Sequence, residues 1–274
     1  MANATLNSKT RLFTIIMWAL SILMIIPFIM MVLISFRIPG DAYKPFFTLL
    51  RPTLKNYAMV LGHKNFFDWY RNTLFTVSTT IILRLAVTLS AAYAFARMEF
   101  RFKHLLIGLL LLTLMVPGET TMVPRYLYFK SIGLLDTSWV IILPEVAQVF
   151  YLVLIIEFFR SIPNDFCEAA LIDGCSSLRI LLSIFLPLSG PIITTTILFS
   201  FINIWNNFLD PYLFINTISR QLITPAMKYF QETGGANIPG QLAGASLAII
   251  PVILLFIFTQ KFFVEGVTSS GIKG

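Results

Sequence analysis

The stretch that decides the fold is FCEAALIDGCSSLRILLSIFLP, residues 166–187. The polar residues just before it supply helix-start chemistry. Gly174 suits the end of that helix, because glycine takes the left-handed backbone conformation without a steric penalty. Ser176 or Ser177 can cap a second short helix, which Pro187 ends or bends. The sequence therefore predicts a polar helix–turn–helix between two very apolar segments.

The first helix of this hairpin offers one fixed charge, Glu168, followed by two small residues that let a partner surface come close. The stretch resembles the EAA loop of importer-type ABC transporter permeases, with glycine and proline at the family spacing. The resemblance implies that a partner ATPase is contacted through Glu168, Ala169, Ala170, Asp173, Gly174, Leu186 and Pro187. The alternative is an amphipathic loop that has this pattern by chance.

The composition excludes a water-soluble globule. Of the 274 residues, 57% are hydrophobic and 12% are charged, and the mean hydropathy is +0.82, whereas soluble domains average about 25% charged residues. The net charge of +7 is spread along the chain, which argues against nucleic-acid binding. A basic excess of this kind fits loops that face anionic lipid.

We expect an all-α polytopic membrane protein with six transmembrane helices, because about 20 apolar residues cross a bilayer. The expected spans are residues 12–36, 73–95, 105–122 (interrupted at Pro117-Gly118), 138–158, 188–205 and 242–263, with residues 37–71 as a loop. The EAA-type coupling helix then lies between the fourth and fifth spans. Lys and Arg are divided almost evenly between the two sides. The positive-inside rule therefore gives little bias, and the cytoplasmic placement of both termini and the hairpin follows from the resemblance.

Motifs for catalysis and metal binding are missing from the sequence. There is no GxxxxGK[ST] for nucleotide, no HExxH and no GxSxG. Cys167 and Cys175 are eight positions apart, which is not a metal spacing, so two free thiols are expected. We therefore expect no catalytic residue and no metal site, and any ATP hydrolysis must come from another chain.

The resemblance extends over about residues 65–274. Phe201 and Trp205-Asn206-Asn207-Phe208 resemble the W-N-[DE]-F passage of carbohydrate importer permeases of the maltose-permease type, with Asn207 in place of the usual acid. Asn207 puts in doubt any charge-dependent role at that position. The resemblance implies a single permease domain over residues 1–274 with the type I ABC importer fold, a core at about 65–265 and a cytoplasmic coupling loop at 161–187.

Such a subunit is half of a translocator. The resemblance implies a second, non-identical permease subunit, two ATPase subunits that carry ATP and Mg, an extracytoplasmic solute-binding protein, a carbohydrate substrate and a bacterial cytoplasmic (inner) membrane, with no cofactor on this chain. By the same resemblance the tail, residues 264–274, reaches between the two ATPases. We expect the punctuated loop 215–240 to face outside and touch the solute-binding protein.

Candidate pathway residues gather at the outer end of the fifth span. Asn203, Asn206, Asn207 and Asp210 can bind sugar hydroxyls or line a gate, and the alternative is an interfacial helix end satisfied by water. Trp205 could stack on a sugar ring, as could Tyr212, although an aromatic belt at the membrane interface also explains both.

Arg84 lies near the middle of the second span, with Thr76, Thr80 and Thr88 on the same helix face. A charge there costs ~2.5–3.5 kcal/mol on insertion scales unless it is paired or hydrated. It therefore either pairs with one of the nearby carboxylates (Glu119, Glu145, Glu157) or lines a cavity for water or substrate.

Three alternatives to carbohydrate import stay open. An anionic solute, such as a sugar phosphate or uronate, would use Arg84 as a counter-charge. A secondary transporter would need inverted repeats and ion-coupling carboxylates, and the sequence shows no repeat. A structural membrane scaffold would bind no ATPase.

Overall fold

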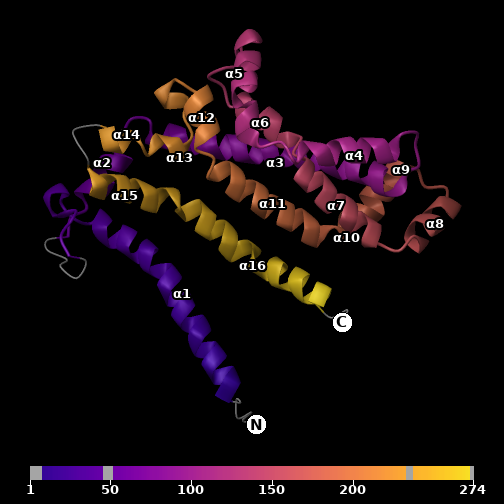
Figure 1. Cartoon of the computed structure of the whole chain (residues 1–274), viewed down its shortest axis with the longest axis horizontal. Helices are drawn as coiled ribbons and strands as arrows, with labels where there is room; N and C mark the ends of the chain where they lie inside the picture. Colours follow the sequence, from indigo (N-terminus) through magenta and orange to yellow (C-terminus); the bar gives the residue numbers. More distant parts are fainter. Residues whose placement is uncertain (1–7, 46–51, 233–236, 272–274) are drawn as a thin grey trace. The chain divides into compact units, whose positions relative to one another are not determined.

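The computed structural model describes residues 8–45, 52–232 and 237–271, and every regular element in this part is helical. The chain divides into two compact units, Met1–Phe66 with Met227–Ile249 and Phe67–Ala226 with Ile250–Gly274. Figure 1 shows the elements of both units. An all-helical chain is what the sequence predicts.

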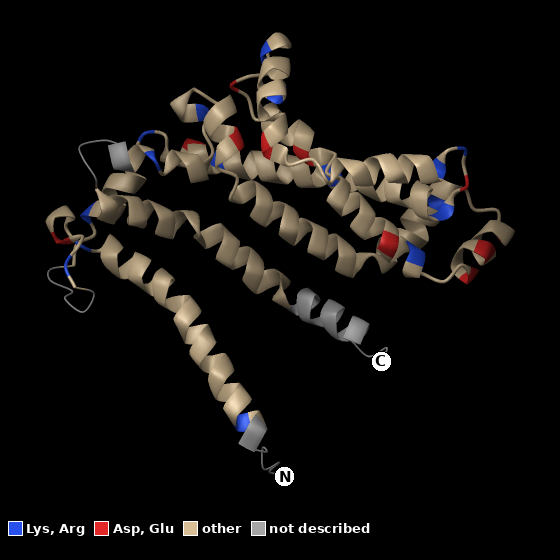
Figure 2. Ribbon diagram, viewed as in Figure 1, with Lys and Arg blue, Asp and Glu red and all other residues tan. Residues whose placement is uncertain are grey.

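The first unit is built around α1 (Ser8–Ser35) and α15 (Ile238–Ala248), which pack against each other. Its other elements are η1 (Pro39–Asp41), α2 (Lys55–Leu61) and α14 (Tyr229–Glu232). The side-chain amide of Asn56 donates to the carbonyls of Ser35 and Arg37 at 2.7 Å each and so ties α2 to the end of α1. Beyond Arg11, α1 carries no charge (Figure 2), which suits a helix that faces lipid.

The second unit holds the remaining helices. The long ones are α3 (Phe66–Arg97), α7 (Val149–Ser161), α11 (Gly190–Trp205) and α16 (Ile250–Gly271). α7 packs against α4 and α11, α11 packs against α16, and α6 packs against α12. The shorter elements are α4 (Lys103–Thr113), η2 (Gly118–Thr121), α5 (Met122–Ser131), α6 (Trp139–Val146), α8 (Asp165–Ile172), α9 (Ser177–Ile180), η3 (Leu181–Phe185, a π-helix), α10 (Leu186–Leu188), α12 (Leu209–Phe214), η4 (Ile218–Arg220) and α13 (Ile223–Ala226).

Four helical stretches in the described residues are long and apolar enough to cross a membrane: Thr10–Ser35, Phe66–Arg97, Trp139–Ser161 and Ile238–Gln260. Two further stretches qualify only as bent pairs, Lys103–Thr113 with Gly118–Ser131 (92°) and Ser177–Leu188 with Gly190–Trp205 (78°). The chain thus has four to six candidate spans, and the count of six stays a prediction. The stretches that correspond to the predicted third and fifth spans are therefore bent, not straight.

A proline stands at or next to each bend. Pro117 has an extended backbone (φ −60°, ψ 134°) directly before η2, and the residue before a proline is itself pushed out of the α conformation. Pro191 stands at the first turn of α11, where a missing N–H is tolerated. The interruption predicted at Pro117-Gly118 is therefore confirmed, whereas the turn between α10 and α11 lies just past the predicted Pro187.

The region predicted as a loop, residues 37–71, is partly helical. It contains η1 and α2, and α3 begins at Phe66 instead of residue 73; residues 46–51 lie outside the described part. The earlier start has a packing reason, because the Trp69 side chain is fully buried and its indole N–H donates to the Ile218 carbonyl at 2.6 Å. Tertiary contacts thus extend the helix beyond its apolar segment.

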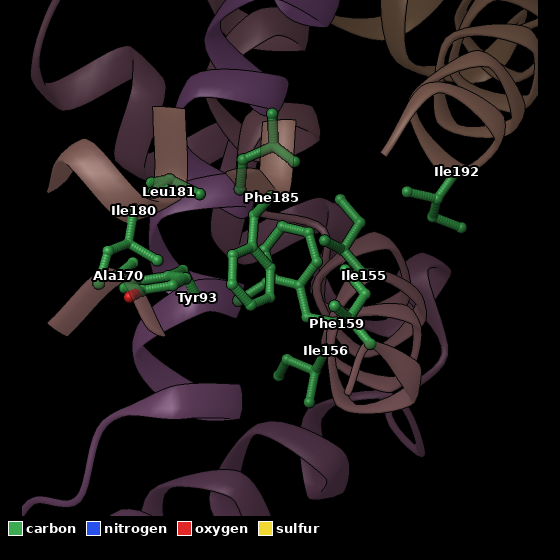
Figure 3. Close-up of a cluster of buried hydrophobic side chains, with 12 residues drawn as sticks. Tyr93, Ile155, Ile156, Phe159, Ala170, Ile180, Leu181, Phe185 and Ile192 are labelled. Atoms are coloured by element: carbon green, nitrogen blue, oxygen red, sulfur yellow. The ribbon is translucent and has the colours of Figure 1, made fainter. Parts of the chain in front are cut away.

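One buried cluster fixes the position of the hairpin that the sequence predicts. In Figure 3, Phe185 lies between Tyr93 of α3 and Phe159 of α7. Both rings meet it edge-on, with centroids 5.1 Å away in each case. Burying an aromatic side chain of this size stabilises the fold by ~1.5–3 kcal/mol. The cluster therefore packs the α8–α10 hairpin, residues 165–188, against α3 and α7.

Candidate functional site

The α8–α10 hairpin has the predicted helix–turn–helix geometry. α8 ends before Gly174, which has φ +72°, and the Ser176 hydroxyl caps the next helix by accepting the backbone N–H of Arg179 at 3.4 Å. The second helical stretch ends at Leu188, one residue beyond Pro187. Glycine is favoured at position 174, because an L-residue in the left-handed conformation is strained by ~1–2 kcal/mol.

The predicted coupling residues face different ways on this hairpin. The exposed ones are Glu168, Ala169, Asp173, Gly174 and Pro187, while Leu186 is half-buried. Ala170 is 7% exposed and belongs to the buried cluster, so only one of the two small residues is open to a partner. Glu168 lines a hollow of about 260 Å³ together with Arg97 and Ser177. The coupling role of these residues stays a prediction.

A second site is a polar cavity of about 650 Å³ in the second unit. It brings together four of the residues predicted for the pathway: Asn203, Asn206, Asn207 and Asp210. Its other lining residues come from η2, α5, α6, α11 and the segments beside them: Gly118, Glu119, Thr121, Met122, Arg125, Pro144, Glu145, Gln148, Ile202 and Leu209. Both the broken third span and the end of α11 therefore contribute to the wall.

Arg125 of α5 is a cavity residue that sequence reasoning did not find. Its guanidinium holds the Asp210 carboxylate in a two-bonded pair, with N–O distances of 2.7 and 3.4 Å. Asn207 supports the same carboxylate by donating its amide N–H at 3.3 Å, and its amide oxygen accepts the Asp210 backbone N–H at 3.2 Å. The pair joins positions that are 85 residues apart, so local sequence patterns do not indicate it. The only sequence signal for Arg125 was a cation shortly after the Pro117 break.

Arg84 is fully buried and bonded on every side. Its Nη2 donates to Oε2 of Glu145 at 2.6 Å, its Nε donates to the Glu145 carbonyl at 2.9 Å, and its Nη1 donates to the Ser200 hydroxyl at 2.5 Å. The guanidinium carbon lies 4.0 Å from the centroid of the Tyr151 ring. Of the two interpretations of Arg84, the geometry supports pairing with a carboxylate.

Glu145 connects that buried pair to the cavity. Its carboxylate lines the cavity wall and also accepts the Asn203 amide N–H at 3.3 Å. Glu119 lines the cavity too, while Glu157 pairs with Arg160 at 2.8 Å. Arg84 therefore contributes to the cavity through Glu145 and does not line it.

The remaining predicted residues lie apart from the cavity. Trp205 is 2% exposed and stacks on Phe201 with centroids 5.1 Å apart, so in this structure it offers no free face to a sugar. Tyr212 is 42% exposed and stacks on Phe208 at 5.4 Å. The hydroxyls on the Arg84 face of α3 are buried and donate to the carbonyl one turn back: Thr76, Thr80 and Thr88.

Two predicted contact segments are only partly described. α16 carries the tail as far as Gly271, residues 272–274 lie outside the described part, and the side chains from residue 261 onward are not described. The loop 215–240 contains η4, α13 and α14, and residues 233–236 lie outside the described part. The contacts expected for both segments stay predictions.

Comparison with known proteins identifies the family. The model described as binding-protein-dependent transport system inner membrane component matches residues 1–269. The chain belongs to this family. It is thus a multi-pass membrane permease component of the ABC importer class, in agreement with its apolar helices and with the resemblance of its hairpin.

Relatives in this family match almost end to end. The chain is 27% identical to the arabinooligosaccharides transport system permease protein AraQ of Halalkalibacterium halodurans, over 97% of this chain and 100% of that protein. It is 30% identical, with the same coverages, to the polygalacturonan/rhamnogalacturonan transport system permease protein YtcP of Bacillus subtilis. A crystal structure of a bacterial ABC transporter involved in the import of the acidic polysaccharide alginate matches with a TM-score of 0.80 and 23% identity, over 94% of this chain and 98% of that one. The latter comparison supports the fold.

Proposed function

We propose that this permease forms half of the translocation pathway for an oligosaccharide, and that the 650 Å³ cavity is this chain's share of that pathway. The observation that carries the proposal is the cavity lining. Asn203, Asn206 and Gln148 present side-chain amides, which can both donate to and accept from sugar hydroxyls. A polar wall of this kind in so apolar a chain is costly unless a polar solute or water uses it.

The charge of the cavity favours a neutral solute over an anionic one. Among the described residues, three carboxylates and one guanidinium line it: Glu119, Glu145, Asp210 and Arg125. The one lining cation is already held by Asp210, and the buried Arg84 is held by Glu145. An anion would meet the carboxylate of Glu119, for which no ion pair is found within the described residues, and like charges repel.

Similar permeases are named for both kinds of solute. AraQ is named for arabinooligosaccharides, which are neutral, and YtcP is named for polygalacturonan, which is a polyuronate. Import of an anionic sugar therefore stays the second candidate. The paired state of Arg84 and Arg125 weighs against it, since neither guanidinium is free to act as a counter-charge.

The α8–α10 hairpin supplies the proposed link to ATP hydrolysis. Glu168 is exposed on α8, and the same hairpin exposes large apolar side chains, with Leu171 60%, Ile172 86% and Leu178 63% exposed. An exposed apolar surface that also carries charged side chains is suited to a contact with a partner protein. We place the ATPases, with their ATP and Mg, on this side, and the second permease subunit beside this chain in the bacterial inner membrane.

The remaining assignments follow from that placement. Both termini lie in the cytoplasm with the hairpin, and the solute-binding protein docks on the opposite, outer side. This chain itself holds no cofactor and carries out no catalysis, because hydrolysis takes place on the partner ATPases.

The test is uptake by the complete importer in proteoliposomes. Arabinotriose and raffinose serve as neutral probes, and trigalacturonate serves as the anionic probe. We expect ATP-dependent uptake of a neutral probe and none of trigalacturonate. Preferred uptake of trigalacturonate would establish the second candidate, uptake driven by an ion gradient without ATP would establish a secondary transporter, and the lack of any co-purifying ATPase would favour a scaffold.

A further inference from the structure

Arg97 is the last residue of α3, and three other segments meet its side chain. Nη2 donates to the carbonyl of Phe159 at 2.6 Å and also to the carbonyl of Ile162, both at the end of α7. Nη1 donates to the side-chain oxygen of Asn164, the residue before α8. The guanidinium carbon lies 5.2 Å from the centroid of the Phe185 ring, in the second half of the hairpin.

The chemistry of these contacts is specific to arginine. The carbonyls at a helix C-terminus lack partners within the helix and carry partial negative charge. A planar guanidinium presents five donors in a fixed fork, so it can reach two carbonyls and an amide oxygen while its face covers an aromatic ring. A lysine ammonium is a point charge on a flexible stem and cannot hold the same directions together.

The hairpin is therefore attached in two different ways. Phe185 and its neighbours provide apolar packing, which is strong but non-directional. The bonds from Arg97 are directional, and they fix how α8 leaves the end of α7. The second attachment therefore constrains the direction in which the hairpin leaves α7 beside α3.

The same helix carries the buried network of the cavity. Arg84, which holds Glu145 at the cavity wall, and Arg97 are both on α3. The two arginines are thirteen positions apart, which corresponds to roughly 20 Å of continuous helix at 1.5 Å per residue. α3 thus connects the attachment of the hairpin to the wall of the cavity without a break.

We propose that Arg97 is a positioning residue for transport: it locks the hairpin to α3, so that movement of the hairpin is passed along α3 to the cavity wall. This inference rests on the proposed docking of the hairpin on an ATPase. Arg97 acts through the hairpin, and its role is to make the hairpin, the end of α7 and α3 move as one lever.

The experiment compares Arg97→Gln and Arg97→Lys with Arg160→Gln as the matched control. Arg160 lies at the end of α7 close in sequence to the hairpin, but its pair with Glu157 is on the surface. Spin labels at the exposed positions Ile172 of α8 and Val87 of α3 report the distance between the hairpin and α3. Cys167 and Cys175 are first replaced by serine so that only these two sites are labelled.

In proteoliposomes with the full importer and the neutral probes, we expect Arg97→Gln to assemble and to hydrolyse ATP at the basal rate. Its distance distribution broadens, and solute-stimulated hydrolysis falls roughly two- to thirty-fold, the range seen when residues along a coupling network are changed. Arg97→Lys restores only part of the coupling, and Arg160→Gln matches the wild type. If Arg97→Gln does not fold, Asn164→Ala removes one acceptor and should show the same changes in weaker form.

Two results would overturn the inference. The first is a wild-type distance distribution in Arg97→Gln, and the second is wild-type coupling despite a broadened distribution. Failure of the proposed function is distinguishable, because then the wild-type chain itself shows no ATPase association or stimulated hydrolysis. In that case the spin-label distances still decide whether Arg97 locks the hairpin to α3. The role of Arg97 in coupling is then rejected together with the proposed function.

Discussion

Arg84 and Glu145 form an ion pair in which the arginine side chain is completely buried and the glutamate carboxylate is 9% exposed, at an N–O distance of 2.6 Å. Removing one partner leaves the other buried without compensation, which typically costs ~3–5 kcal/mol. We therefore expect Arg84→Gln to lower the unfolding temperature strongly in nanodiscs. Glu145→Gln should destabilise less, because its backbone carbonyl still accepts from Arg84.

The matched control is Arg71→Gln on the same helix. Arg71 pairs with Asp68, but its side chain is 78% exposed, and such surface pairs are worth about 0–1 kcal/mol. Equal unfolding temperatures for the Arg71 and Arg84 variants would contradict the buried pairing.

The charge of Glu168 separates a docking role from helix support. Asp165 and Glu168 are both exposed acids in the first turn of α8, so each should stabilise the helix through its dipole by ~0.3–1 kcal/mol. We expect Glu168→Gln to insert normally but to lose solute-stimulated ATP hydrolysis, while Asp165→Asn retains it. Equal behaviour of the two variants in the reconstituted importer would reduce Glu168 to a helix-supporting role.

Gly174 tests the turn itself. An added Cβ would meet no atom within 4 Å, so the whole effect of Gly174→Ala comes from its φ of +72°. That strain is ~1–2 kcal/mol and re-aims the second helix of the hairpin. We expect normal insertion with weakened stimulation of hydrolysis. Gly190→Ala is the control, since position 190 is also open but lies in a helix; wild-type coupling in both variants would argue against a coupling hairpin.

The hairpin was predictable because its geometry follows from local chemistry. A glycine at the turn, a serine that caps the next helix and a proline near the end act on their own neighbours. The structure has Gly174 in the left-handed region and Ser176 as a cap. The membrane class was predictable for a similar reason, because it depends on composition over whole segments.

The cavity and the bends were less predictable because they depend on contacts between distant residues. Arg125 meets Asp210 from 85 positions away, and nothing in either local sequence indicates the other. Tryptophan is a residue type that often anchors a helix at the membrane interface, yet Trp205 is buried and packs against Phe201. Arg97 lies within residues 65–274, the part of the chain that resembles the family, but its contacts with the end of α7 could be found only from the structure.

Asp136 holds the segment after α12 and makes its stability depend on pH. Burial acts to raise the pKa of its carboxyl, but hydrogen bonds from the Thr217 hydroxyl and the backbone N–H groups of Thr217 and Asn216, together with the charge of Arg220, lower it overall. Because the pKa of Asp136 is lower in the folded state, its ionised carboxylate stabilises the folded segment at any pH above the ordinary pKa of 3.8. This stabilisation is lost as the pH falls through the lowered pKa.

We therefore expect the amide hydrogen exchange of residues 216–220, corrected for the intrinsic exchange rate, to show no opening of the segment between pH 7 and 5. Below about pH 4 the exchange should show that the segment opens. Asp136→Asn removes one carboxylate acceptor and should open the segment at every pH, at a cost of ~1 kcal/mol. Asp68→Asn, at an exposed surface pair, should leave the segment unchanged. Opening that begins already between pH 7 and 5 would contradict this assignment.

Asp210 sets the charge that a solute meets in the cavity. Its carboxylate neutralises Arg125, whose side chain is 24% exposed. Asp210→Asn removes the carboxylate that holds Arg125, so the Arg125 guanidinium becomes available to an anion. Arg125→Gln instead keeps the Asp210 carboxylate and makes the cavity more negative. We expect Asp210→Asn to shift uptake toward trigalacturonate relative to arabinotriose by roughly ten-fold, equivalent to ~1.4 kcal/mol.

The double variant Arg125→Gln/Asp210→Asn is the control for this change. It removes both charges, so the preference for the neutral probe should return even though two lining residues have changed. Asp136→Asn, which removes a carboxylate outside the cavity lining, should leave the ratio of the two probes at the wild-type value. An unchanged ratio in Asp210→Asn would mean that the solute does not pass this pair, and it would count against the cavity as the pathway.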